Sequence, residues 1–229
     1  MLEKLKQSFS KWTKLDYAWL IIANLTILSL SLYWRDSLTA IISAMTGITC
    51  VIFISKQMIA NYYFGIVNVA LYALLSFEAK LYGDFALNAF IYFPAQFFGL
   101  YLWTKAKRRD KDNEVKVRRL TNKQRFYLAL GCFIAILVFA EALKLLGGNI
   151  VILDAASTII SIIAQILMLF LYVEQWYLWV IVNIISVTMW ALSLSNGIGD
   201  AATLIMWILY LANSLYGLYN WRKASKENN

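Results

Sequence analysis

The 229-residue chain is 61% hydrophobic and 16% aromatic but only 15% charged, which excludes a water-soluble monomer. It contains no histidine, and Cys50 and Cys132 stand far apart, which excludes histidine-based catalysis and Cys/His metal sites. The net charge of +8 fits either nucleic-acid binding or a basic fringe on a membrane protein, so the positions of the basic residues decide.

The stretch from Leu2 to Leu15 has the pattern of an amphipathic helix at a membrane surface. Its apolar side chains recur at spacings of three and four, with lysines between them. No small-residue cleavage site follows a short apolar region, so we expect this stretch to be retained and not removed as a signal peptide.

Eight apolar segments are long enough to cross a bilayer as helices, since a crossing takes roughly 20 residues. Lipid offers the backbone no hydrogen-bond partners, and the length of the segments argues against barrel strands. The predicted spans are Tyr17 to Trp34, Leu38 to Ser55, Ile59 to Phe77, Phe85 to Trp103, Phe126 to Leu146, Ile150 to Val173, Trp176 to Leu194 and Ala201 to Asn220. We therefore predict an all-α polytopic membrane protein.

The basic residues lie mainly on one side of these spans. Eighteen of the 21 lie before the first span, at Lys56, between Lys105 and Arg125, or after Asn220. The positive-inside rule then places both termini and the long basic loop in the cytoplasm. The net charge is thus mostly a topology signal, and nucleic-acid binding is disfavoured because the run from Lys105 to Arg119 lacks interleaved aromatics that stack on bases.

The two halves of the chain share a weak internal repeat. At an offset of 115 residues, Asn61, Phe64 and Asn68 match Trp176, Trp179 and Asn183. At an offset of 116, Gly83 and Asp84 match Gly199 and Asp200. At an offset of 118, Gly99 to Tyr101 and Trp103 match Gly217 to Tyr219 and Trp221. Matched helices lie four crossings apart and so point the same way, which predicts parallel repeats. Transporters use such repeats to build a substrate site at their interface, although a duplication without transport is the alternative.

This repeat divides the chain into five predicted segments. They are an interfacial helix with the first span (1–37), a first three-helix repeat (38–104), a basic loop with a linking helix (105–147), a second three-helix repeat (148–222) and a tail (223–229). We predict a 3+1+3 arrangement preceded by an extra N-terminal helix.

Polar residues follow one side of the third and fourth spans. Asn61, Phe64, Asn68 and Tyr72 do so in the third, and Asn88, Tyr92, Gln96 and Gly99 in the fourth. The sole proline, Pro94, lies within the fourth span, where it removes a donor and predicts a kink. This bend is either a hinge for a gate or a fixed element that shapes a pocket.

The seventh span carries the strongest signal. Trp176, Trp179, Asn183 and Trp190 share one stripe at spacings of three, four and seven. An amide at Asn183 is expected to face the protein interior, because lipid offers it no partner. Trp179, one turn away, favours a pocket, whereas Trp176 and Trp190 fit a pocket or an interfacial aromatic belt equally well.

In the eighth span, Tyr210, Asn213 or Ser214, and Gly217 repeat this pattern. Four helices thus offer amides or aromatic hydroxyls to a common interior. Hydrogen-bonded glue between helices is the alternative. Indole faces and amides suit a small, flat, hydroxyl-bearing solute that is uncharged or cationic. A phosphorylated solute fits poorly, because no Lys or Arg interrupts these four helices.

The membrane-proximal acidic residues have structural explanations. Asp84 and Asp200 each follow a glycine at the start of a span, where a carboxylate caps free N–H groups. Glu141 and Lys144 are three apart and are expected to pair, and Asp154 starts the sixth span. No carboxylate relay crosses the membrane, which disfavours obligatory proton coupling.

The pattern Trp176-x-x-Trp179-x-x-x-Asn183, followed by Trp190, resembles the signature of the PnuC-type vitamin transporters, related in fold to the SWEET family. The resemblance spans most of the chain. It implies facilitated diffusion of nicotinamide riboside, trapping by intracellular phosphorylation, and a homotrimer in a bacterial cytoplasmic membrane. It also implies substrate roles for Trp176, Trp179, Asn183 and Trp190.

We expect further substrate contacts from the interior side chains of Asn68, Asn88, Gln96, Tyr210 and Asn213. We expect no cofactor, no metal and no nucleic-acid partner. Thiamine or riboflavin is the alternative substrate. An intramembrane lipid-acting enzyme is a second hypothesis, although the scattered carboxylates do not form a metal or acid-base site. A membrane scaffold that recruits acidic partners through its basic loop is the third.

Overall fold

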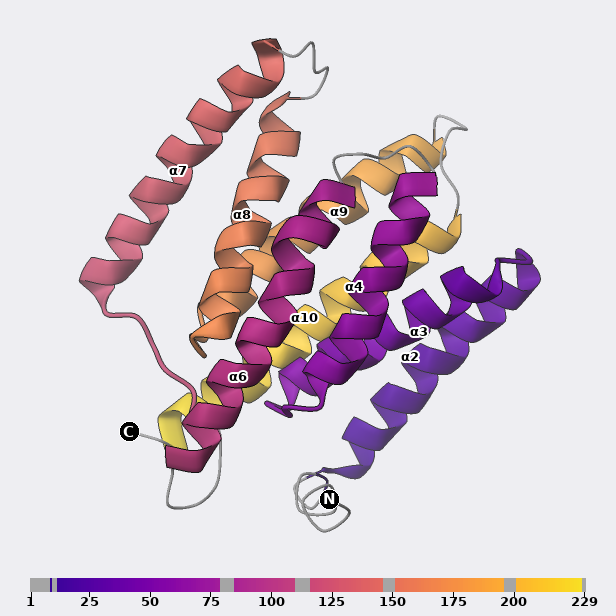
Figure 1. Ribbon diagram of the computed structural model, residues 1–229, viewed down its shortest axis with the longest axis horizontal. Coiled ribbons are helices and arrows are strands. Elements are labelled where there is room, and N and C mark those ends of the chain that lie inside the picture. The colour runs from indigo at the N-terminus through magenta and orange to yellow at the C-terminus, as the bar shows by residue number, and fades with distance from the viewer. Residues whose placement is uncertain are drawn as a thin grey trace. The chain divides into compact units, whose positions relative to one another are not determined.

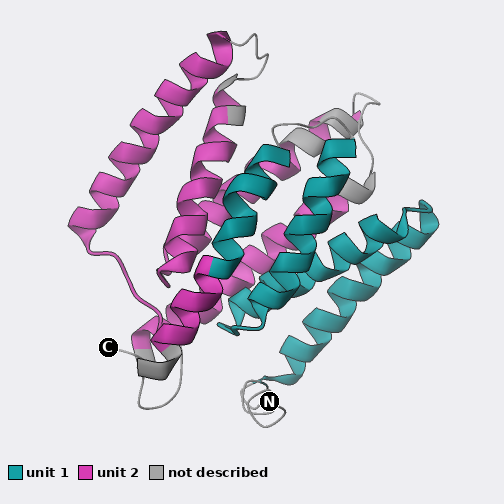
Figure 2. Cartoon of the chain, in the orientation of Figure 1, with its two compact units in different colours: residues 1–97 teal, residues 98–229 magenta. Residues whose placement is uncertain are grey.

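The computed structural model describes residue 9 and residues 12–78, 85–109, 116–145, 151–195 and 201–227. Within these ranges it contains eight α-helices and one π-helical stretch, and the chain divides into two compact units, Met1–Phe97 and Phe98–Asn229 (Figure 2). The predicted all-α fold is confirmed.

In unit 1, three helices and a π-helical stretch pack in sequence order. α3 (Leu38–Ser55) contacts both α2 (Lys14–Tyr33) and α4 (Asn61–Glu78), and α4 also contacts the π-helical stretch η1 (Leu87–Tyr92). The buried face of α3 includes Ser43 and Gly47, small residues of the kind that let helices approach closely in membranes.

A polar cap and an ion pair fix the start of α2. Thr13 and Asp16 form a capping box, in which the Thr13 N–H donates to Asp16 Oδ2 at 2.7 Å and the Asp16 N–H donates to Thr13 Oγ1 at 3.3 Å. Asp16 is almost fully buried and also accepts from Lys56 Nζ at 3.0 Å. This ion pair ties the start of α2 to the end of α3.

The predicted amphipathic helix at the N-terminus lies mostly outside the described residues. Of its aromatic side chains, Phe9 and Trp12 are described, and both contact α3. The Trp12 ring lies 5.8 Å from that of Phe53 and is buried. The interfacial helix therefore stays a prediction.

In unit 2, helices that follow one another in the sequence pack side by side. α7 (Asn122–Leu145) contacts α8 (Val151–Leu169), α8 contacts α9 (Gln175–Ser195), and α9 contacts α10 (Ala201–Glu227) (Figure 1). α6 (Phe93–Arg109) begins in unit 1 and continues into unit 2. Unit 2 thus brings α9 and α10, which carry six of the nine predicted site residues, into direct contact.

All eight predicted spans correspond to helices. The bounds of α3 agree with the prediction at both ends, and most other bounds agree within four residues. The larger differences are at two C-terminal ends that extend beyond the apolar core, in α6 to Arg109 and in α10 to Glu227.

The surface of the described helices is apolar. By length and composition, α2, α3 and α7 are each able to cross a membrane, and shorter apolar helices span Ala155–Leu169 and Gln175–Thr188. α7 exposes Phe126, Phe133 and Val138 by 60% or more. An exposed apolar surface of this extent along a 24-residue helix is typical of contact with lipid or another protein.

Candidate substrate site

Asn183 lies near the middle of α9 and faces α10. Its side chain is 5% exposed, and its Nδ2 donates to Ser214 Oγ at 2.6 Å. The Ser214 hydroxyl in turn donates to the Tyr210 carbonyl at 2.9 Å. The prediction that this amide faces the protein interior is confirmed. This chain of hydrogen bonds uses Asn183 Nδ2 and leaves its Oδ1 as an acceptor for another group.

Trp176 lies in a cluster of three buried tryptophans, Trp103, Trp176 and Trp221. The Trp221 ring centroid is 5.9 Å from that of Trp103 and 6.0 Å from that of Trp176. Trp103 Nε1 donates to the Met168 carbonyl at 3.1 Å, whereas Trp176 Nε1 is buried without a hydrogen-bond partner. Trp176 is 3% exposed, so the interpretation as a lipid-facing belt residue is wrong for it.

Trp179, one turn further along α9, is only half-buried. Among the tryptophans of the α9 stripe, it is therefore the one whose described side chain offers accessible ring surface. The side chain of Trp190 lies outside the described residues, so its choice between pocket and belt stays open.

The predicted residues of α10 lie next to Asn183. Asn213 is 1% exposed and precedes Ser214, the acceptor of the Asn183 amide. Tyr210 is half-buried, and its ring packs edge-on against Trp207 at 5.8 Å. Of the two residues that the sequence left as alternatives, Ser214 is the one that bonds to α9, and Asn213 is the more deeply buried.

In unit 1, Asn68 connects α4 to α3. Its Nδ2 donates to the Ser43 carbonyl at 2.8 Å, and the Ser43 hydroxyl donates to the Asn68 carbonyl at 3.4 Å. This exchange of hydrogen bonds between two helices is typical of the alternative role, in which the amide holds helices together and does not bind substrate. The Asn68 side chain is nevertheless only half-buried, so part of it stays accessible.

Gln96 and Asn88 are the buried amides of the fourth predicted span. Gln96 is 5% exposed, its Oε1 has no hydrogen-bond partner, and it lies where a Cβ on Gly65 would be. Asn88 is 8% exposed and lies in η1. An unpaired buried oxygen is costly, so Gln96 is prepared to accept a hydrogen bond from a ligand, as is Asn61 of α4, whose Oδ1 is also buried without a partner.

The backbone departs from α geometry just before Pro94. η1 ends at Tyr92, and the Phe93 N–H donates to the Asn88 carbonyl in the wider π pattern. A proline cannot donate to the carbonyl four residues earlier, and the π turn rearranges this region of the ladder. The backbone irregularity that the structure describes lies on the N-terminal side of the proline, whereas a kink and a hinge at Pro94 stay predictions.

Two buried glutamines of unit 2 lie outside the predicted stripes, since Gln165 belongs to α8 and Gln175 directly precedes the predicted seventh span. Gln175 is 0% exposed and neither of its amide atoms has a hydrogen-bond partner. Gln165, in α8, is 7% exposed and its Nε2 is unpartnered. Gln165, like Asn183, is an amide inside an apolar helix and faces the protein interior.

Ordered contacts at the end of the basic loop were also missed. The Arg118 N–H donates to the Leu171 carbonyl at 2.8 Å, and the Val173 N–H donates to the Arg118 carbonyl at 3.0 Å. Glu174 then accepts from Leu120 N at 3.2 Å and from Arg125 Nη2 at 2.8 Å. These contacts fix the turn that leads into α9.

Arg119 extends this contact to the C-terminal part of α10. Its Nε donates to Ser225 Oγ at 2.7 Å and its Nη2 donates to the Arg222 carbonyl at 3.1 Å. Part of the basic loop therefore contributes to the packing of unit 2.

The remaining acidic residues fall into two groups. Glu141 and Lys144 pair as predicted, although at 3.9 Å and with both side chains exposed. Asp84 and Asp200, with the glycines before them, lie outside the described residues, as does the side chain of Asp154. Among the described residues, no group of three His, Cys, Asp or Glu side chains is placed to hold a metal ion.

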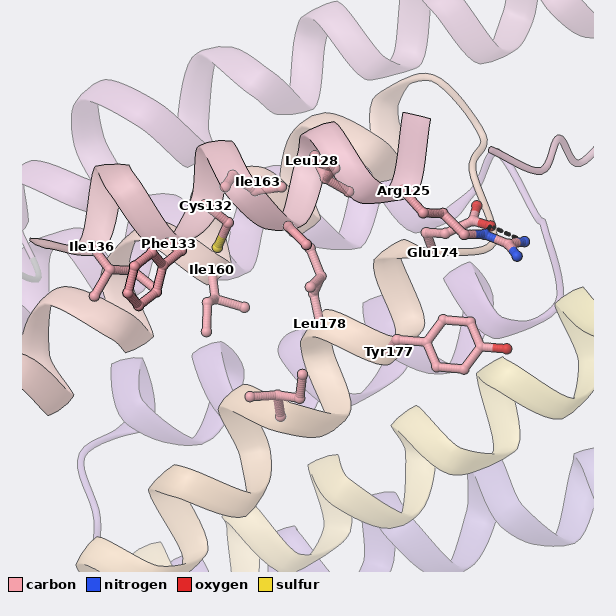
Figure 3. Close-up of a pocket in the computed structure, with 12 residues that line it drawn as sticks. Arg125, Leu128, Cys132, Phe133, Ile136, Ile160, Ile163, Glu174, Tyr177 and Leu178 are labelled. Carbon is pink, nitrogen blue, oxygen red and sulfur yellow. Dashed lines mark hydrogen bonds and ion pairs between the residues drawn. The ribbon is translucent and has the colours of Figure 1, made fainter. Parts of the chain in front are cut away.

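A groove of about 470 Å³ lies between α7, α8 and α9, and none of the nine predicted site residues is among the side chains that line it (Figure 3). Its walls are apolar except at one end, where Arg125 and Glu174 meet. The groove is therefore a separate feature from the candidate substrate residues.

Apolar helices with buried amides and indoles on paired elements are the features of a multi-pass membrane transporter. Comparison with known proteins identifies the group. A sequence model of the nicotinamide mononucleotide transporter family matches residues 37–223, and the chain belongs to this family.

Relatives and a solved structure agree with this placement. Two relatives are named nicotinamide riboside transporter PnuC: the one from Neisseria mucosa is 37% identical over 97% of this chain and 86% of its own length, and the one from Haemophilus influenzae is 36% identical over 99% and 98%. A crystal structure of the vitamin B3 transporter PnuC matches with a TM-score of 0.85 at 36% identity and covers 100% of both chains.

The resemblance to PnuC-type transporters is therefore confirmed, together with the fold. The chain is a transporter and a multi-pass bacterial membrane protein, and the hypothesis of an intramembrane enzyme is wrong.

Proposed function

We propose that this protein imports nicotinamide riboside by facilitated diffusion and that intracellular phosphorylation traps the product. The names of the relatives support nicotinamide riboside as the substrate. The main support is the composition of the four candidate helices. These helices bury amides and indoles, yet no Lys or Arg occurs in them before Lys105 on α6 and Arg222 on α10.

This absence of cations distinguishes the riboside from the mononucleotide. The family description names the phosphorylated compound, whereas the relatives are named for the riboside. Recognition of phosphate normally uses charge-assisted hydrogen bonds from Arg or Lys. A site built from amides, hydroxyls and indole faces suits the nicotinamide ring and the ribose hydroxyls, and the positive pyridinium ring of the riboside is favoured by indole faces.

The mechanism follows from the lack of a charge relay. The sequence from Asn61 to Phe77 and from Trp176 to Ser195 contains no carboxylate, so no chain of titratable groups runs through these helices. Without coupling, the riboside moves down its own gradient. Net uptake then continues because a phosphorylated product no longer fits the transporter.

The buried and half-buried side chains have distinct roles in this proposal. Asn183, oriented by Ser214, offers its Oδ1 to the ligand, and Trp179 stacks on the nicotinamide ring. Trp176 supports this face from within the tryptophan cluster, and its free Nε1 remains available as a donor. Trp190, Asn68, Asn88, Gln96, Tyr210 and Asn213 complete the proposed set.

Binding measured by quenching of tryptophan fluorescence tests the substrate directly. We expect nicotinamide riboside to bind more tightly than nicotinamide mononucleotide, thiamine and riboflavin. Asn183→Ala should weaken riboside binding by about tenfold or more, equivalent to roughly 1.4 kcal/mol. Thr188→Ala, an exposed position on the same helix, is the matched control and should bind normally. Tighter binding of another vitamin, or normal binding by Asn183→Ala, contradicts the proposal.

We further propose a homotrimer in the cytoplasmic membrane with both termini inside the cell. The orientation rests on the eighteen basic residues that lie on one side of the predicted spans. Native mass spectrometry of the detergent-solubilised protein should give three times the 26.3 kDa chain mass. A monomeric mass under conditions that preserve riboside binding contradicts the trimer.

A further inference from the structure

The groove between α7, α8 and α9 has a defined apolar surface. On α7 it is lined by Leu128, Ala129, Cys132, Phe133 and Ile136, which share one helix face. α8 contacts both α7 and α9 and supplies Ile160 and Ile163, and α9 adds Leu178 and Ile181. Such a groove accommodates an unbranched apolar chain.

The groove is polar at one end only. Arg125 and Glu174 lie at that end, and Phe133 and Ile136 lie at the other (Figure 3). The Arg125 guanidinium donates to Glu174 Oε1 at 2.8 Å, yet its side chain remains 46% exposed. The Tyr177 hydroxyl points toward the same end (Figure 3).

The charge around this end is positive. Arg118 and Lys123 are exposed, and the backbone of Arg118 is held to the turn just before Glu174. Among the described side chains of residues 116–178, the carboxylates are Glu141, far along α7, and Glu174. The segment from Arg118 to Arg125 therefore brings three cations near this end of the groove against the one carboxylate of Glu174, and this positive charge is complementary to an anionic headgroup.

The length of the groove matches one leaflet of a bilayer. Arg125 and Ile136 are eleven residues apart on one helix, which at 1.5 Å per residue is about 16 Å. Half of a hydrocarbon core of about 30 Å is about 15 Å. The polar end lies next to the basic loop, where the membrane surface is expected, and the apolar end then reaches the midplane.

We infer that this groove binds an anionic phospholipid, with one acyl chain between α7 and α9 and the phosphate at the Arg125 end. This inference needs only that the chain spans a membrane and does not depend on the identity of the vitamin. Bound there, the lipid fills the space between α7 and α9 over the floor that α8 provides.

Two adjacent residues of α7 give a matched pair of variants. Ala129 lines the groove, whereas Leu130 is exposed outside it. In native mass spectrometry with added phosphatidylglycerol, the wild type and Leu130→Trp should retain one tightly bound lipid per chain. Ala129→Trp should reduce the lipid-bound fraction about tenfold, because the indole occupies the acyl position. Cys132→Phe, one turn further along the same face, repeats the test if Ala129→Trp does not fold.

The headgroup is tested separately. The double variant Arg118→Gln and Lys123→Gln leaves the Arg125–Glu174 pair in place and should abolish a preference for phosphatidylglycerol over phosphatidylcholine. Equal lipid retention by Ala129→Trp and Leu130→Trp overturns the proposal. So does a change in oligomeric mass of Ala129→Trp at unchanged lipid binding, because the groove then holds a second copy of the chain.

Discussion

Gly217 leaves the space that the indole of Trp176 fills. A Cβ at Gly217 would collide with the six-membered ring of this indole, which is rigid and already packed against Trp221. Gly65 does the same for Gln96 in unit 1, although there the obstructed atoms are at the end of a flexible side chain. Two of the proposed substrate residues thus depend on a neighbouring glycine for their position.

We predict that Gly217→Ala destabilises the protein by about 1–3 kcal/mol, because a rigid ring in a packed cluster must move. The same change should weaken riboside binding if Trp176 supports the ligand. Thermal unfolding in detergent and fluorescence quenching measure the two effects. Gly131→Ala is the control, since nothing lies within 4 Å of the added methyl group and alanine favours the helix. Equal stability of the two variants contradicts this account.

The placement of a side chain could be predicted where the chemistry of that residue alone determines it. Asn183 had to face the protein because an amide in an apolar helix needs a partner, and it does. The tryptophan cluster could not be predicted in this way, since Trp103 and Trp221 are 118 positions apart and their contact depends on how three helices pack. The buried amide of Gln175, whose Nε2 and Oε1 have no hydrogen-bond partner, likewise depends on how the helices pack.

At the scale of elements, the start of α9 is held by the segment that precedes α7. Glu174 is 8% exposed and accepts from the backbone of Leu120 and from two nitrogens of Arg125. α9 carries Trp176, Trp179 and Asn183, so this anchor positions the proposed site from outside it. The sequence indicated only that the loop is basic. These contacts could not be predicted from it, because they join residues about 50 positions apart.

Glu174→Gln should lower the stability of the protein by about 1–3 kcal/mol, because a charged acceptor of several hydrogen bonds is lost at a buried position. Glu141→Gln is the matched control. Its carboxylate is exposed and 3.9 Å from Lys144, so its replacement should change stability by less than about 0.5 kcal/mol. Thermal unfolding of both variants is the measurement, and an indistinguishable effect of the two rejects the anchoring role of Glu174.

A substitution of Pro94 tests whether the π-helical stretch before it moves during transport. Pro94→Ala restores a backbone donor and favours a regular helix. If the irregular segment is a hinge, the transport rate should fall at least severalfold while riboside affinity stays the same. Initial rates in vesicles, compared with equilibrium binding, separate the two quantities. An unchanged rate assigns the bend a static role.

For the whole molecule, the eight spans could be predicted because the bilayer imposes length and composition on each helix. Their ends were less predictable where polar sequence continues a helix, as in α10 from Arg222 to Glu227. The repeat relation between the halves comes from matched residues such as Asn68 and Asn183, and both of these occupy helices that pack against a neighbour through that amide. The parallel arrangement of the repeats stays a prediction from the sequence.

Transport of labelled nicotinamide riboside by the purified protein in kinase-free liposomes tests the central claim most directly. We predict that the riboside equilibrates in both directions without a pH or sodium gradient, and that nicotinamide mononucleotide does not enter, because the four helices offer its phosphate no cation. Accumulation of riboside above its outside concentration when either gradient is imposed, or entry of the mononucleotide at a similar rate, would contradict the account.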